Sequence, residues 1–208
     1  MDSTLPQKFI NDYFLLRRLF VKKIVESKSV KEIRNLMYEV SPLLSPMVAT
    51  YGPAGLNNAP FMLTFVPKEE YLEDVLSALE AEITRPSKLS IKTVAELLLR
   101  TVYNPDIVDL SKLASHLMNK GHTYVNVKAT GEATIGILIP PDKGAYELRC
   151  KAEIIEDGPI YRYVNIVHDL MHVAPHGGGG HGWCPAIIFT IKEIYDNHYK
   201  VLGKKIYP

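Results

Sequence analysis

Histidine is concentrated in one short stretch of this sequence. Four of the seven histidines lie within the fourteen residues 168–181, and four consecutive glycines separate the last two of them. The first two are four residues apart, a spacing that puts two imidazoles on one face of a helix. Imidazole nitrogens and cysteine thiolates are preferred ligands of zinc and other transition metals. One hypothesis is therefore a metal-binding protein or a metal-dependent hydrolase that holds zinc or another transition metal with His168, His172, His176, His181 and Cys184.

The pattern around these histidines matches no established zinc motif. No second close pair follows at a zinc-finger spacing, and the segment between His168 and His172 lacks the glutamate that acts as base in zinc proteases. Solvated or hydrogen-bonded histidines on a loop are the alternative. The glycines 177–180 supply no side chain to bury, so they suit a loop that moves or whose amides approach a ligand, for example a phosphate.

The two cysteines are too few for a disulfide scaffold. Cys150 falls on the apolar face of an alternating segment, where we expect a small core residue. Cys184 follows the histidine-rich stretch and is a candidate reactive thiol.

Hydrophobic periodicity divides the chain into helical and extended segments. Helical spacing of apolar residues occurs over 6–26, 29–41, 68–100 and 160–172. A further short helix is predicted to begin at Asp109 or Ser111 and to end near Gly121. Alternation or a continuous apolar run predicts a hairpin over 47–66 and strands over 123–128, 133–139, 145–155 and 186–194. This order predicts a single α+β domain with a mostly antiparallel sheet that could close as a small barrel.

Several separated segments, in their order along the chain, resemble the FMN-binding split barrel of the pyridoxamine 5'-phosphate oxidase and flavin reductase type. They are the hairpin 48–61, the segment 109–127, the strand and turn 145–161, and the C-terminal segments 191–196 and 203–206. The resemblance implies a small split β-barrel built from 46–67 and 122–208, with N-terminal helices in 1–45 and a helical insertion in 68–121. It also implies a homodimer with FMN at the subunit interface, and an oxidoreductase that acts on a small-molecule substrate.

The same resemblance assigns roles to particular residues. The pyrimidine edge of the flavin ring would lie against Asn58, Ala59 and Pro60, because a strand interrupted by proline leaves backbone acceptors unused. The phosphate would be held by Ser111 and Lys112 at the start of the predicted short helix, with Lys128 on the next strand as a second anchor. The glycine-rich loop would form a lid, and His176 or His181 would donate a proton. A non-catalytic split-barrel protein that serves as a binding module is a further alternative.

Charge and hydropathy bear on whether the protein binds nucleic acid, spans a membrane or is secreted. The chain has 24 Lys and Arg against 23 Asp and Glu, which gives a net charge of +1 and no strong basic field for nucleic acid. We expect no membrane-spanning segment and no secretory signal, and therefore a cytoplasmic protein. The single Gln is compatible with a thermophilic source.

Overall fold

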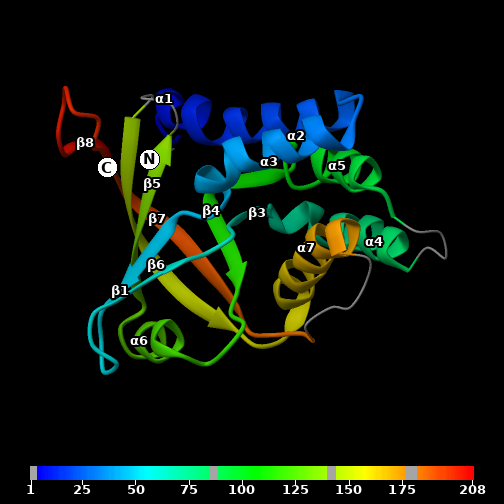
Figure 1. Cartoon of the computed structure of the whole chain (residues 1–208). Helices are drawn as coiled ribbons and strands as arrows, with labels where there is room; N and C mark the ends of the chain where they lie inside the picture. Colours follow the sequence, from blue (N-terminus) through cyan, green and yellow to red (C-terminus); the bar gives the residue numbers. More distant parts are fainter. Residues whose placement is uncertain (1–3, 85–88, 140–143, 177–181) are drawn as a thin grey trace.

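The computed structural model describes residues 4–84, 89–139, 144–176 and 182–208, except for the side chains of 173–176. In this part of the chain eight strands form one antiparallel sheet (Figure 1). The strands are β1 (Met47–Thr50), β2 (Asn57–Pro60), β3 (Thr64–Pro67), β4 (Val108–His116), β5 (Glu132–Ile139), β6 (Gly144–Ile155), β7 (Ala186–Asp196) and β8 (Lys204–Tyr207).

Helices surround this sheet and connect its strands. They are α1 (Gln7–Phe9), the π-helical η1 (Ile10–Leu15), α2 (Leu16–Glu26), α3 (Val30–Leu44), the 3-10 helix η2 (Glu69–Tyr71), α4 (Leu72–Ile83), α5 (Ile91–Arg100), α6 (His122–Thr130) and α7 (Gly158–His176). The described helices and strands therefore make an α+β fold, as the sequence predicts. None of the described helices combines the length and the apolar character that crossing a bilayer requires.

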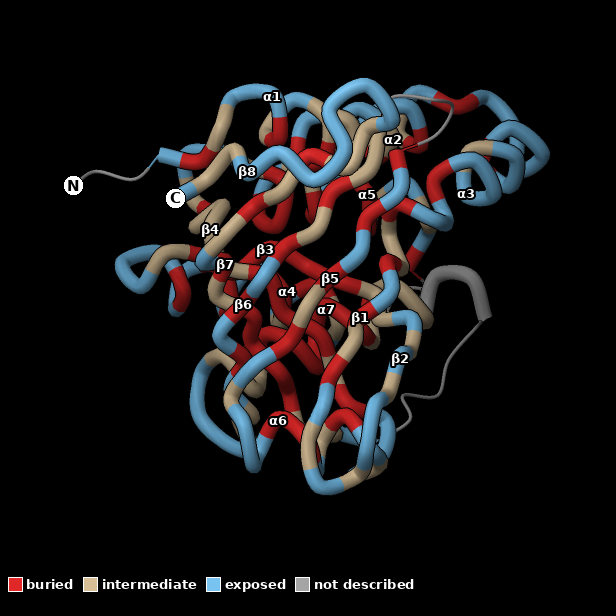
Figure 2. The backbone as a smooth tube through the Cα atoms, turned by 90° about the vertical axis from the view of Figure 1, so that its left-hand side faces the viewer, coloured by how far each residue is buried: buried red, intermediate tan, exposed pale blue. Residues whose placement is uncertain are grey.

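The strands follow the order β2-β1-β5-β6-β7-β4-β3 across the sheet, and β8 pairs with β7. The strand with the clearest alternation in the sequence, β6, lies between β5 and β7 and pairs with both. No pairing joins β2 to β3 among the described residues, so these two strands end the path and the sheet is not closed. The buried residues lie between this sheet and the helices that cover it (Figure 2).

The predicted hairpin is present, but it contains only two of the three strands in its segment. Met47 pairs with Pro60 and Thr50 with Asn57, so β1 and β2 form the hairpin. The third strand, β3, leaves the hairpin and pairs with β4 at the other end of the sheet.

The sequence prediction of a short helix over 109–121 is wrong, because residues 108–116 form β4. Phe65 of β3 pairs with Leu113 of β4, whereas the next residue, Val66, pairs with Asp109. Residues 110–112 therefore bulge out of the β3–β4 ladder, and this bulge interrupts the period of two that marks a regular strand. The remaining apolar spacing of three and four residues imitates a helix.

The predicted strand over 123–128 is also wrong, because it forms α6. Its buried residues Thr123, Asn126 and Val127 have the spacing of one helix face. Gly131 ends the helix in the left-handed conformation, with φ of 68°. Threonine, tyrosine and valine near the start of this helix favour a strand locally, and its packing against the hairpin overrides that preference.

The N-terminal helices begin where the sequence predicts. Ser29 caps α3, since its side chain accepts a hydrogen bond from the Glu32 amide at 3.2 Å, and the Glu32 carboxylate accepts one from the Lys28 amide at 2.8 Å. On α2 the buried guanidinium of Arg17 donates to the hydroxyls of Tyr13 and Tyr103, each at 3.0 Å, and to the carbonyl of Leu63. These contacts tie α2 to the segment between β2 and β3.

Candidate functional site

A pocket of about 620 Å³ lies where β2, the end of β4, the first turn of α6 and the helix α7 meet. Figure 2 labels β2, α6 and α7, each of which contributes residues to its lining. A volume of this size is within the range of pockets that hold small organic ligands. The pocket is lined by Ser45, Asn57, Ala59, Pro60, Phe61, Met62, Ser115, His116, Leu117, Met118, Asn119, Gly121, His122, Thr123, Tyr124, His168 and His172.

The pocket lining includes two of the residues predicted to meet a flavin ring, Ala59 and Pro60 of β2. The apolar residues Phe61 and Met62, which follow the end of β2, also line it. Asn58 does not line the pocket, and its side chain is exposed. Successive side chains of a strand point to opposite faces, so Asn57 and Ala59 share one face of β2, and both line the pocket.

Four histidines from three elements form the other chemically distinctive part of the lining. His116 ends β4, His122 begins α6, and His168 and His172 lie one turn apart on α7. The ring centroids of His116 and His168 are 3.5 Å apart, and those of His168 and His172 are 4.3 Å apart. No Asp, Glu, Lys or Arg is among the described residues that line the pocket. The four imidazoles are therefore the nitrogen acid–base groups in this lining.

The sequence pattern indicates only part of this histidine group. The spacing of His168 and His172 singles out these two residues, whereas nothing in the sequence singles out His116 and His122. Both flank the segment 117–121, where the sequence prediction places a helix instead of a strand end and a helix start. His116 ends β4 and His122 begins α6, so correct boundaries for these two elements would have indicated both residues as site candidates.

The residues predicted to anchor a phosphate do not line this pocket. Ser111 and Lys112 lie on β4 beside Asp109: the Ser111 hydroxyl donates to the Asp109 carboxylate at 2.6 Å, and the Lys112 ammonium lies 3.1 Å from it. Burial acts to raise the pKa of Asp109, but the hydrogen bonds from Ser111 and Lys112 outweigh it and lower that pKa. The expected position of Ser111 and Lys112 at a helix start is wrong, since both belong to a strand.

Lys128 also has a different setting from the expected one. It lies on α6, not on a strand, and its ammonium is 3.0 Å from the carboxylate of Glu156. Lys120 and the hydroxyl of Tyr124 reach the same carboxylate at 2.9 and 3.1 Å. Hydrogen bonds from Lys120, Lys128 and Tyr124 lower the pKa of Glu156 to about 2. Lys128 therefore forms part of an exposed ion-pair cluster near one end of the pocket.

Of the four histidines in the metal hypothesis, two have side chains that the structure describes, His168 and His172. The ring of His168 lies between those of His116 and His172, tilted by 33° to the first and by 46° to the second. The part of the chain that the structure describes contains no group of three or more His, Cys, Asp or Glu side chains able to hold a metal ion. The side chain of His176 and the whole of His181 lie outside the described residues.

Cys184 has a separate environment. Its backbone is held by Asn165 of α7, whose side chain donates to the Cys184 carbonyl and accepts from the Cys184 amide, each at 2.9 Å. Its thiol lies 3.5 Å from the carbonyl of Gly182 and does not line the pocket.

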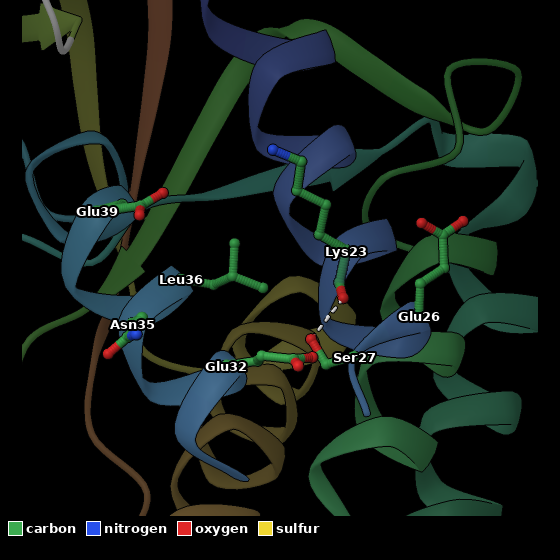
Figure 3. Close-up of a pocket in the computed structure, with 7 residues that line it drawn as sticks. All are labelled: Lys23, Glu26, Ser27, Glu32, Asn35, Leu36 and Glu39. Atoms are coloured by element: carbon green, nitrogen blue, oxygen red, sulfur yellow. Dashed lines mark hydrogen bonds between the residues drawn. The ribbon is translucent and has the colours of Figure 1, made fainter. Parts of the chain in front are cut away.

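A smaller pocket of about 360 Å³ lies between α2 and α3 (Figure 3). Charged and polar side chains around Leu36 line it, and Ser27 donates to the Lys23 carbonyl at 2.7 Å. None of the predicted site residues is in its lining. The larger pocket is therefore the candidate site.

Comparison with known proteins gives a likeness of fold. No family model matches this chain, and no curated protein matches it. A crystal structure of HupZ from Group A Streptococcus is similar to it, with 14% sequence identity, coverage of 83% of this chain and 97% of that chain, and a TM-score of 0.46. A protein of the pyridoxinephosphate oxidase family from Clostridium acetobutylicum, related to general stress protein 26, has 13% identity, coverage of 89% and 93%, and a TM-score of 0.44.

An FMN-binding protein from Syntrophomonas wolfei is also similar, with 12% identity, coverage of 88% of this chain and 91% of that chain, and a TM-score of 0.41. Proteins of the pyridoxine phosphate oxidase family and FMN-binding proteins are thus among the structures that this chain is similar to.

Proposed function

We propose that this protein binds FMN in the larger pocket and is an FMN-dependent oxidoreductase with a small-molecule substrate. The observation that carries the proposal is the position of Ala59 and Pro60. The resemblance in the sequence assigns these residues to the edge of the flavin ring, and they line a cavity of cofactor size. The chemistry of hydride or electron transfer would belong to the flavin, while the protein supplies orientation and access.

The lining residues fit a flavin ring. An isoalloxazine needs apolar surface for its faces and a few polar groups for its edge. Phe61, Met62 and Leu117 offer the first. The strand at Ala59 and Pro60 and the side chain of Asn57 offer the second. The absence of fixed charges among the described lining residues suits an uncharged tricyclic ring.

The phosphate needs another anchor, since Ser111, Lys112 and Lys128 do not line the pocket. The first turn of α6 is the candidate, because Gly121, His122 and Thr123 line the pocket and no side chain caps this helix. Backbone amides at a helix N-terminus bind anions, and the helix dipole favours negative charge there. In this proposal α6 takes the role that the sequence gives to the segment around Ser111.

The pocket histidines are the candidate proton donors. His116 and His168 lie with their rings in contact at the inner wall, while His122 is exposed at the start of α6. A histidine that faces the ligand can hold a proton near neutral pH and donate it when the substrate is reduced. In our proposal the four lining histidines take the role that the sequence assigns to His176 and His181.

The proposal is tested by the visible spectrum of the protein as isolated and by titration with FMN. We expect flavin absorption in the blue and near-ultraviolet, or quenching of FMN fluorescence on reconstitution. The variant Ala59→Phe puts a ring into the cavity and should lower the affinity for FMN by about tenfold or more.

Asn58→Phe is the matched control, because it adds the same ring to the same strand at a position that does not line the pocket. Its affinity for FMN should stay within about twofold of that of the wild type. Repeated reconstitution without FMN binding, or equal losses in the two variants, would contradict the proposal.

A further inference from the structure

The turn of the β1–β2 hairpin is attached to α6 by one buried side chain. Asn126 is fully buried, and its amide group makes three hydrogen bonds to the hairpin. Its Oδ1 accepts from the Ala54 amide at 2.9 Å, and its Nδ2 donates to the Gly55 carbonyl at 2.8 Å and to the Thr50 hydroxyl at 3.3 Å. One carboxamide thus satisfies both a backbone donor and a backbone acceptor of the same turn.

A second contact lies one turn away on the same face of α6. The side-chain Nδ2 of Asn57 donates to the Thr123 hydroxyl at 2.7 Å, and Thr123 is three residues before Asn126. Residues three apart are neighbours on a helix surface. The hairpin is therefore held to α6 at its turn by Asn126 and at the start of β2 by Thr123.

Close packing at the turn shows how little freedom this attachment leaves. A Cβ atom built on Gly52 would lie 2.9 Å from Asn126 Oδ1 and 3.1 Å from Asn126 Cα. The backbone at Gly52 therefore approaches the helix more closely than another residue type would allow. Gly55 closes the turn with its amide bonded to the Gly52 carbonyl at 2.9 Å.

Both attached elements contribute residues to the pocket lining. The strand β2 contributes Asn57, Ala59 and Pro60, and the start of α6 contributes Gly121, His122, Thr123 and Tyr124. Asn126 itself does not line the pocket. We propose that Asn126 is a positioning residue, which sets the distance between these two parts of the ligand pocket by tying the hairpin turn to α6.

The chemistry of the contact explains why asparagine is needed. The Ala54 amide can only donate and the Gly55 carbonyl can only accept, so the group between them must both accept and donate. An aspartate would place a second carboxylate oxygen against the Gly55 carbonyl. An alanine would leave a buried backbone N–H and C=O without their partner.

The proposal rests on the proposed function for its ligand, so FMN is the probe. We expect Asn126→Ala and Asn126→Asp to lower the affinity for FMN by about tenfold, because β2 is no longer held at its distance from α6. We also expect faster hydrogen exchange of the backbone amides in 51–60, measured by mass spectrometry without any ligand. The exchange measurement does not depend on flavin.

Asn165→Ala is the matched control. Asn165 is also buried, and its amide also holds a backbone segment through one donated and one accepted bond, but the residue that it holds, Cys184, does not line the pocket. This variant should lose a similar free energy of unfolding and keep its affinity for FMN within about twofold.

Equal affinity losses in Asn126→Ala and Asn165→Ala would overturn the proposal, since they would show a general effect of lost stability. Unchanged exchange of 51–60 in Asn126→Ala would also overturn it. If the wild type itself binds no FMN, the flavin proposal fails, and the exchange arm alone decides whether Asn126 holds the hairpin. The two failures are therefore distinguishable.

Discussion

The two cysteines show how an environment decides the reactivity of one residue type. Cys150 lies on β6 and is 4% exposed, as its place on the apolar face of an alternating segment predicts. Burial raises the pKa of its thiol to about 12. Cys184 is half-buried and lies at the surface beside Trp183. The thiolate is the nucleophilic form of cysteine, so the two thiols must differ in reactivity.

Alkylation by iodoacetamide at about pH 8 should therefore modify one cysteine of the native protein, Cys184. Mass spectrometry of the intact protein is expected to show one added group, and peptide mapping should place it. Cys184→Ser should give no modification, whereas modification of both cysteines in denaturant provides the control. Rapid labelling of Cys150 in the native state would show that the core around β6 is open.

At the scale of elements, the sequence predicts strands well where one face is regularly buried. Strand β5 buries Ala133, Ile135, Ile137 and Ile139 in strict alternation, and its segment is predicted correctly. The prediction for the segment of β4 is wrong for a local reason. A bulge in β4 shifts its register against β3 between Phe65 and Val66. The prediction for the start of α6 is wrong because residues with strand propensity are held in a helix by contacts with the hairpin. Neither the bulge nor these contacts can be predicted from the sequence of one segment alone.

The position of Leu113 offers a direct test of the β4 assignment. Leu113 is fully buried between Phe65 of β3 and Phe189 of β7, whereas Leu110 lies in the bulge and is partly exposed. In the predicted helix, if it begins at Asp109 and ends near Gly121, these two leucines would lie on one face, and truncating either one would cost a similar free energy of unfolding. In the strand, Leu113→Ala should cost about 2–5 kcal/mol.

Leu110→Ala is the matched variant and should cost about 1 kcal/mol or less. The free energy of unfolding of both variants is measured by urea denaturation, with the slope of the transition as a check on two-state behaviour. Equal costs for the two leucines would contradict the bulged strand.

At the scale of the whole molecule, the sequence predicts the α+β class but not which distant segments meet. The order along the chain cannot show that β3 pairs with β4 across the helices α4 and α5, or that β2 and β3 lie at opposite ends of the sheet. The candidate site is formed by segments that are far apart in the sequence. Ala59 and His168 are separated by more than half of the chain and line one pocket, whereas Ser111 and Lys112 are turned to a local carboxylate instead.

The first described helix, α1, and the last strand, β8, both contact the end of β7. Lys8 of α1 forms an ion pair with Asp196, the last residue of β7, and β8 pairs with the same part of that strand. Burial acts to raise the pKa of Asp196, but the hydrogen bond and charge of Lys8 and the amide of His198 outweigh it and lower that pKa from its ordinary value of 3.8. A carboxyl group with a lowered folded pKa stabilises the fold above its unfolded pKa, and this contribution is lost as the pH falls through the folded pKa.

Removing the cation should therefore matter at neutral pH and not in acid. We expect Lys8→Met to lower the free energy of unfolding by about 1 kcal/mol near pH 7, and the difference from the wild type to shrink as the pH falls through the lowered folded pKa of Asp196. Lys22→Met is the control, because Lys22 lies 3.7 Å from Glu26 and both side chains are mostly exposed, so its effect should be small at every pH. Urea denaturation at a series of pH values measures both variants. A difference between wild type and Lys8→Met that persists unchanged in acid would show that Lys8 stabilises the fold by packing rather than by its pair with Asp196.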